Sequence, residues 1–177
     1  MDTNLYDRFI QRAGLGPDPT LVELVEAIRA IPHARPRERS GEAVVRDWCG
    51  TCSTKHDLLR KLRPDLELRF VHRLFRLHRD AAREQLGEDF ARMVPEDGFL
   101  DVHTYATILV DGRRTVIDVT FPGEPWDGRS DMAVSCGPGR DFPVETGEPF
   151  ASKDALVREH GDPRMRELLV AALQASH

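Results

Sequence analysis

The chain has 177 residues, of which 40% are hydrophobic and 31% charged, a composition typical of a folded globular protein. Its formal net charge of -5 gives no general reason to expect nucleic acid as a partner. No apolar run approaches the length of a membrane span, and Asp2 and Asp7 lie where a signal peptide needs a basic start and an apolar core. We therefore expect one cytoplasmic domain over residues 1–177, with no membrane partner and an undetermined oligomeric state.

Helical spacing of apolar residues marks the first part of the chain. It predicts a short helix over Leu5–Ala13 and a second over Thr20–Ile31. The sequence Asp18-Pro19-Thr20 provides a capping residue and a proline at the start of the second helix. Pro32–Gly41 is polar, basic and contains proline, so we expect an exposed connection there.

The next helix carries the first candidate for chemistry, Cys52. Gly50-Thr51 indicates a turn and an N-cap, and leucines follow at helical spacing until Pro64. This places Cys52 in the first helical turn, where the helix dipole favours thiolate over thiol. A strand over Leu66–Leu74 and a charged helix over His78–Met93 are expected to follow.

A β-hairpin is the clearest strand pattern of the sequence. Asp111-Gly112 lies between two runs rich in β-branched residues, 102–110 and 113–121, which is a strong hairpin signal. Pro122–Pro149 holds ten of the 25 Gly and Pro residues, so we expect an irregular segment with at most a short strand over Met132–Ser135.

Two helices, Ser152–His160 and Pro163–Gln174, are expected to end the chain. Helices, then an antiparallel sheet, then helices predict an α+β domain in which the Cys52 helix packs on the sheet between N- and C-terminal helices.

The hairpin brings two further chemical groups to one face. If Asp111-Gly112 form a two-residue turn, Thr120 lies opposite His103 and Asp118 lies diagonal to it. Side chains alternate along strands, so His103 and Asp118 project from the same face, within reach of each other. With Cys52 packed against that face, Asp118 would orient His103, which would take the thiol proton of the nucleophile.

These residues also resemble a known family. In HTYATILVDGRRTVIDVTFP, His103, Tyr105, Gly112, Asp118 and Thr120 occupy the places of the transglutaminase-like signature, and GTCSTKHDLLRKL resembles its nucleophile segment. The resemblance covers residues 48–122 and implies a papain-like fold with thioester-mediated acyl transfer or amide hydrolysis at Cys52. The substrate would be an unknown peptide, amide or acyl compound.

The sequence departs from that pattern at several points. Tyr105 follows the histidine where Trp is usual, Arg114-Thr115 stand where the second strand often carries a Trp, and an additional charged helix separates Cys52 from His103. There is no calcium-site pattern and no second cysteine pair for zinc, so we expect no metal and no cofactor.

Two other classes of function remain open. Trp48-Cys49-Gly50-Thr51-Cys52 resembles the redox dithiol of thioredoxin-like proteins, in which Cys49 and Cys52 would form a disulfide. That fold needs a strongly apolar strand directly before the motif, and GEAVVRD is short and charged. A non-catalytic binding module on the same papain-like fold is the second alternative.

Three aromatic residues, Trp48, Tyr105 and Trp126, are candidates for substrate contacts. Trp126 follows the Asp118 strand and could wall a substrate cleft, although a packing role is equally compatible. The segment Lys55–Arg83 holds nine basic residues against four acidic ones, which favours a solvated face over recognition of an acidic ligand.

Overall fold

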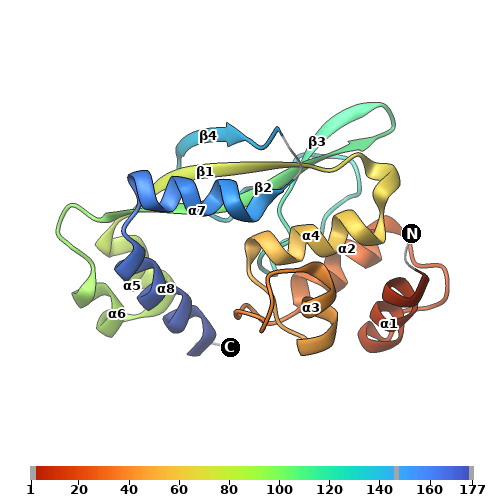
Figure 1. Cartoon of the computed structure of the whole chain (residues 1–177), viewed down its shortest axis with the longest axis horizontal. Helices are drawn as coiled ribbons and strands as arrows, with labels where there is room; N and C mark the ends of the chain where they lie inside the picture. The colour runs from red at the N-terminus through yellow and green to blue at the C-terminus, as the bar shows by residue number, and fades with distance from the viewer. Residues whose placement is uncertain (1–2, 146–147, 176–177) are drawn as a thin grey trace.

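A four-stranded antiparallel sheet runs along one side of the molecule, in the strand order β3-β2-β1-β4 (Figure 1). A computed structural model describes residues 3–145 and 148–175 of the chain. The strands are β1 (Arg69–Leu77), β2 (Phe99–Val110), β3 (Arg113–Ile117) and β4 (Gly139–Pro143). Together with the helices, this sheet confirms the α+β class.

Most helices lie below the sheet in the view of Figure 1. Within the two described ranges there are eight α-helices: α1 (Thr3–Ala13), α2 (Leu21–Ala30), α3 (Gly41–Asp47), α4 (Cys52–Leu62), α5 (Arg79–Leu86), α6 (Glu88–Met93), α7 (Pro149–His160) and α8 (Pro163–Ala175). A 3₁₀ turn, Pro64–Leu66, follows α4. None of the helices in these ranges is both long and apolar enough to cross a membrane.

The β2–β3 hairpin has the register that the sequence predicts. Val110 pairs with Arg113, and Asp111 and Gly112 form a two-residue turn with φ of 47° and 78°. Positive φ at both central residues is the type I′ geometry that Asp-Gly favours. Strand β3 ends at Ile117, so Asp118 is the first residue beyond it.

Two expected elements have different boundaries in the structure. The strand expected over Leu66–Leu74 begins only at Arg69, because Pro64 starts a 3₁₀ turn that includes Leu66. The single helix expected over His78–Met93 is two helices, since Gly87 interrupts it with a φ of 85° that a continuing helix does not allow.

The structure also differs from the expected strand over Met132–Ser135 and from the expected exposed connection over Pro32–Gly41. Met132–Ser135 is not a strand; the fourth strand is β4, which pairs with β1 along the edge opposite β2. The connection Pro32–Gly41 is not fully exposed, because His33 and Ala34 are buried where this segment forms a parallel bridge to Gly50. Helix α3 was not expected.

Two hydrophobic clusters lie at opposite ends of strand β2. One joins α1–α4 to the β2–β3 end of the sheet, with Phe9, Ile28, Leu58, Ala106 and Ile117 among its members. The other joins α5, α6 and α8 to the first residues of β2, with Phe75, Phe90, Phe99, Met165 and Leu169 among its members. The middle of β2, where His103 lies, therefore falls between two separately packed regions.

Candidate active site

The start of helix α4 fixes the position of Cys52. Thr51 precedes the helix in an extended conformation, and its N–H donates to Thr54 Oγ1 over 2.9 Å, while its carbonyl accepts from the Lys55 N–H. A Cβ at Gly50 would lie 2.8 Å from Lys55 Cγ, so only glycine fits directly before this turn. Cys52 is the first helical residue, and its own N–H has no acceptor within the helix.

His103 and Asp118 form a buried hydrogen bond across the hairpin. His103 Nε2 lies 2.8 Å from Asp118 Oδ2, and both side chains are almost fully buried. The second ring nitrogen, Nδ1, is thereby left for the thiol of Cys52. The diagonal relation expected from the two-residue turn thus brings these two side chains together.

The Asp118 carboxylate is bonded at both oxygens. Oδ1 accepts from the N–H of Thr120, at 3.0 Å, and from its hydroxyl, at 2.5 Å. Oδ2 also accepts from the N–H and the hydroxyl of Ser135, both at 2.7 Å. Four donated bonds besides the imidazole fix the orientation of the carboxylate, and the irregular segment supplies two of them.

Lys153, a residue the sequence did not single out, lies against the thiol. Its ammonium Nζ is 2.9 Å from Cys52 Sγ and 3.2 Å from Ser53 Oγ, and the side chain is only 2% exposed. It reaches the site from α7, which packs on β1 and β2 (Figure 1). No motif marked this lysine, because its contact spans 101 residues and depends on helix docking.

The charges at these four residues shift one another's pKa. Burial opposes ionisation of the Cys52 thiol, but the Lys153 charge and a hydrogen bond to His103 outweigh it, so this pKa lies well below its ordinary value. For His103, burial is outweighed by the charge and hydrogen bond of Asp118, which raise the pKa to about 9. The pKa of Asp118 is lowered, since the His103 charge and hydrogen bond overcome its burial. Burial lowers the pKa of Lys153, against the thiolate charge. These shifts act together to favour a thiolate–imidazolium pair over a neutral thiol and imidazole.

A chain of hydrogen bonds continues from Ser53 beneath helix α7. Ser53 Oγ lies 2.9 Å from Thr104 Oγ1, which is 3.1 Å from His72 Nδ1. His72 Nε2 lies 2.9 Å from the hydroxyl of Ser152, one residue before Lys153. Burial lowers the pKa of His72 to about 4, so this histidine is neutral at pH 7. The chain ties strands β1 and β2 to the helix that carries Lys153.

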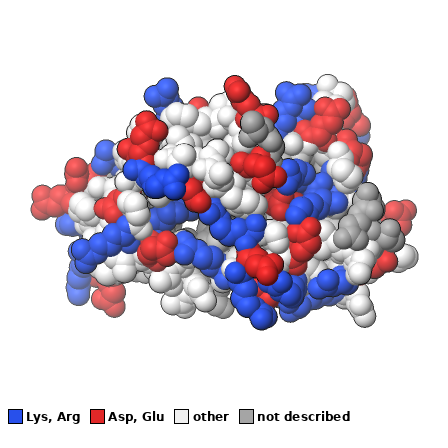
Figure 2. All heavy atoms as spheres, in the orientation of Figure 1, with Lys and Arg blue, Asp and Glu red and all other residues white. Residues whose placement is uncertain are grey.

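A cleft of about 440 Å³ opens over Cys52 and His103. Its apolar lining includes Phe75, Leu77, Val157, Leu169 and Leu173. Its charged lining consists of five basic and three acidic residues: Arg35, Arg39, Lys153, Arg158, Arg166, Asp101, Asp154 and Glu167. Basic side chains also gather across the middle of the face shown in Figure 2. The cleft is thus more basic than the chain as a whole.

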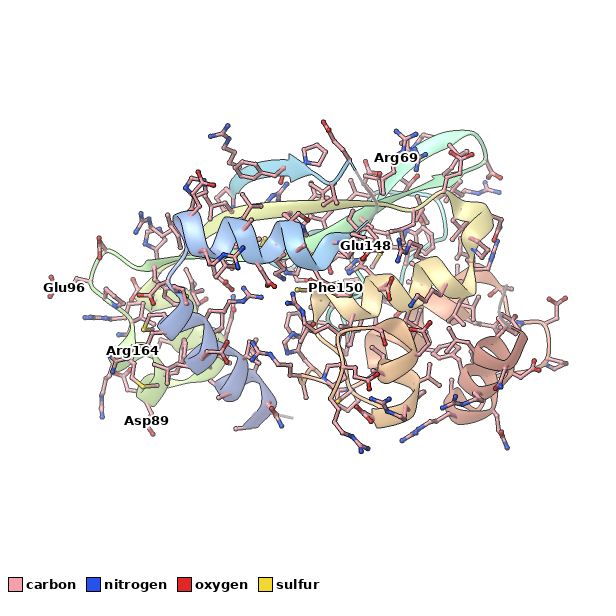
Figure 3. The ribbon with its side chains drawn as sticks, in the orientation of Figure 1. Arg69, Asp89, Glu96, Glu148, Phe150 and Arg164 are labelled. Carbon is pink, nitrogen blue, oxygen red and sulfur yellow. The ribbon has the colours of Figure 1, made fainter. Side chains whose placement is uncertain are left out.

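Ion pairs hold most of these charges in place. Arg35 pairs with Glu167, and Arg39 with Asp154 at 2.6 Å. The Arg39 guanidinium also lies 5.2 Å from the ring of Phe150, which Figure 3 labels in the first turn of α7. These contacts connect the 33–40 segment to α7 and α8 across the cleft.

One polar atom beside the cleft has no partner among the described residues. His33 Nδ1 is buried without a hydrogen bond, and the ring stacks on Phe121 with centroids 4.9 Å apart. Burial lowers the pKa of His33 to about 4, so the ring is neutral at pH 7. This arrangement makes His33 an uncharged wall of the cleft near Cys52.

The three aromatic candidates lie outside the residues that line the cleft. Trp48 packs beside Phe9, with the Arg12 guanidinium 5.2 Å from its ring. Trp126 is buried in the larger cluster and donates from Nε1 to the Ser130 carbonyl. Tyr105 is buried, and its hydroxyl accepts from the Arg73 guanidinium at 3.4 Å. Each of the three has a packing contact that accounts for its position.

The nine basic residues of the segment Lys55–Arg83 also lie outside the cleft lining, although Phe75 and Leu77 of the same segment belong to it. Arg73 pairs with Asp141, Arg83 with Asp80 and Glu88, and Arg79 donates to the Val94 carbonyl. The basic residues at the cleft come from other parts of the chain.

The surroundings of Cys49 and Cys52 differ from those that a thioredoxin-like redox pair needs. GEAVVRD, directly before the motif, forms helix α3 instead of a strand. Cys49 is half-buried and outside the cleft lining, and burial together with the Asp47 charge raises its pKa. Cys136 does line the cleft, and burial raises the pKa of its thiol to about 12. Of the three cysteines, only Cys52 is in a setting that favours a thiolate.

No family model, curated protein or solved structure matches this chain. Among the described residues, no cluster of three or more His, Cys, Asp and Glu side chains is suited to hold a metal ion.

Proposed function

We propose that this chain is a cysteine-dependent enzyme of the transglutaminase-like, papain-like type, acting on an amide or acyl group through a thioester on Cys52. The observation that carries the proposal is the buried His103–Asp118 bond beside a Cys52 thiol whose pKa is lowered at a helix start. A nucleophile, a base and a group that orients the base are the parts that covalent acyl chemistry requires.

The reaction follows from these roles. The thiol proton resides on His103, and Cys52 Sγ attacks the carbonyl carbon to form a C–S bond while an electron pair moves to the oxygen. The bond to the leaving group then breaks, and His103 protonates that group, leaving a thioester. Water or an amine attacks the thioester next, His103 takes its proton, and the C–S bond breaks to return the thiolate. The first acceptor gives hydrolysis and the second acyl transfer.

The lining of the cleft supports small acyl groups as substrates. Apolar residues and eight charged ones surround a volume of about 440 Å³, which is the size of an ordinary small-molecule site. A carbonyl compound entering this cleft meets Cys52 and His103, both of which are otherwise covered.

Intact-mass analysis with p-nitrophenyl acetate tests this proposal. We expect one acetyl adduct, located on Cys52 by peptide mapping and lost in Cys52→Ser. The adduct should turn over with water or with added amines. A protein that gives no Cys52 adduct but forms a Cys49–Cys52 disulfide in a glutathione buffer would support the redox alternative instead. Adduct formation without turnover of any ester or amide would support the binding module.

A further inference from the structure

Attack by Cys52 on a carbonyl creates a negative charge on the carbonyl oxygen, and this charge needs hydrogen-bond donors. The Cys52 N–H, at the start of α4, is one donor. A second donor must lie near the sulfur, because the oxyanion forms on an atom only two bonds away from it. The site therefore needs a donor that the Cys-His-Asp set does not contain.

The hydroxyl groups nearest to Cys52, and His103, are already engaged. The hydroxyl of Thr120 donates to Asp118, and that of Ser53 lies 4.0 Å from Cys52 Sγ and bonds to Thr104. His103 is needed for the leaving-group proton, and it is held by Asp118 on its other side. Lys153 is the cation that contacts the sulfur directly, and it has an N–H bond to spare.

Lys153 has three N–H donors and two bonded partners in the described part of the chain, Cys52 Sγ and Ser53 Oγ. Its ammonium lies 2.9 Å from the reacting sulfur and is held in the cleft wall with 2% exposure. A buried charge fixed beforehand stabilises a developing opposite charge more strongly than a mobile, hydrated one.

We propose that Lys153 is a catalytic residue that moves its hydrogen bond from the thiolate of Cys52 to the oxyanion as the C–S bond forms. The negative charge passes from sulfur to oxygen in that step, and the ammonium stays paired with it throughout. No proton is transferred to or from Lys153, so His103 remains the only acid and base. This inference rests on the proposed function, since it needs a carbonyl substrate at Cys52.

Two reagents separate this role from a simple effect on the thiol. Iodoacetamide alkylates the thiolate by displacing iodide and forms no oxyanion, whereas p-nitrophenyl acetate acylates it through an oxyanion. Neither leaving group needs a proton from His103. The ratio of the two rates, each taken on its plateau above the thiol pKa, therefore reports oxyanion stabilisation alone.

We expect Lys153→Met to lower the plateau acylation rate by about 100-fold or more, the usual cost of removing one oxyanion donor. The plateau alkylation rate should stay level or rise a little, because a thiolate of higher pKa is a better nucleophile. Lys153→Arg keeps the charge and should recover part of the acylation rate. Lys61→Met, which removes an exposed lysine paired with Glu42, is the matched control and should leave both rates unchanged.

Both rates are measured at Cys52 on variants shown to be folded, because an unfolded chain would react with both reagents at the same thiol. A loss of the same factor in both reactions would overturn the oxyanion role and leave Lys153 as a positioning residue. Wild-type protein that is alkylated at Cys52 but never acylated there would overturn the proposed function, and the role of Lys153 with it.

Discussion

Two buried lysine–histidine pairs lie near Cys52, and they bond to different kinds of partner. Lys55 and His56 belong to α4 itself, whereas His103 and Lys153 come from β2 and α7. In the first pair, Lys55 Nζ donates to the carbonyls of Arg29 and Thr120, at 3.2 and 2.8 Å. His56 Nδ1 bonds to the Cys52 carbonyl at 2.7 Å, and its Nε2 accepts from the Val119 N–H. All four of these partners are backbone groups.

In the second pair, Lys153 and His103 bond to ionisable side chains. Lys153 contacts the Cys52 sulfur, and His103 contacts the Asp118 carboxylate. The difference is visible in the two histidines, because burial lowers the pKa of His56 while the Asp118 charge raises that of His103 to about 9. Asp118 also lies 3.9 Å from His56 Nε2, so the two pairs differ in whether an ionised side chain is a direct hydrogen-bond partner. On that basis we assign a structural role to the first pair and a chemical role to the second.

Asp118→Asn should have the largest effect, because it removes the counter-charge of His103. We expect acylation of Cys52 to fall roughly 10²–10⁴-fold. The alkaline limb of kcat against pH should lie near 9 in the wild type, where His103 loses the proton that the leaving group needs. In the variant this limb should move to lower pH, since the charge that raises the pKa is gone.

A pH–rate profile with an amide or alkyl ester substrate measures both effects. Asp141→Asn is the matched control, since that carboxylate pairs with Arg73 at the sheet edge and should leave the limb in place. A limb that remains near 9 in Asp118→Asn would mean that His103 does not owe its raised pKa to this carboxylate.

Replacing each histidine in turn compares the two sides of α4 directly. His103→Ala should slow iodoacetamide labelling of Cys52 at pH 6.5 by at least about tenfold, since each unit of thiol pKa changes the thiolate fraction tenfold. His56→Ala should leave the labelling profile of the folded protein near that of the wild type. It should instead lower the free energy of unfolding by about 1–3 kcal/mol, because buried backbone groups lose their partner.

Urea unfolding and the pH profile of labelling, measured on both variants, provide the test. The comparison between the two sides fails if His56→Ala shifts the thiol pKa as far as His103→Ala does.

Lys55→Met should weaken folding while leaving the cleft chemistry intact. Two buried carbonyls would lose their donor, so we expect a loss of about 1–3 kcal/mol in the free energy of unfolding at pH 8.5. Burial lowers the pKa of Lys55 from 10.5 to about 7. Between about pH 7 and pH 10.5 this lysine is protonated in the unfolded chain but largely neutral in the folded protein, so it makes the free energy of unfolding rise with pH. Below about pH 7 both states are protonated, and this dependence on pH ends.

Denaturant unfolding of wild type and Lys55→Met between pH 6 and 10 tests the sign. The stability difference between the two proteins should grow as the pH rises. A difference that is constant over this range would show that Lys55 has an ordinary pKa.

Lys61→Met should have the smallest effect, below about 1 kcal/mol in the free energy of unfolding. Its ammonium pairs with Glu42 at the surface and with the buried Asp57, which keeps its bonds from the Gly41 N–H and Arg60. Thermal unfolding checks it. A loss as large as that of Lys55→Met would mean that burial does not distinguish the two lysines.

Much of the site could be predicted because it follows local rules. Gly50-Thr51 before a leucine-rich run places Cys52 at a helix start. Asp111-Gly112 fixes the hairpin register, and that register alone puts His103 and Asp118 on one face. Both inferences use periodicity and turn geometry over fewer than twenty residues, the range in which sequence patterns are most informative.

Aromatic side chains were the poorest guide to the cleft. Trp48 and Trp126 pack in the larger hydrophobic cluster, where the area they bury explains their position. A large aromatic residue near a motif has the same sequence pattern whether it faces a substrate or the core, so periodicity could not separate the two cases.

Local sequence is enough to predict the helix start at Cys52, the turn at Asp111-Gly112 and the pairing of His103 with Asp118, because each depends on residues close together in the chain. Only the tertiary structure decided that Lys153 lies 2.9 Å from the sulfur and that Ser135 donates to Asp118. These contacts depend on how α7 and the irregular segment dock on the sheet. Docking is determined by packing among many distant side chains, which no local pattern records.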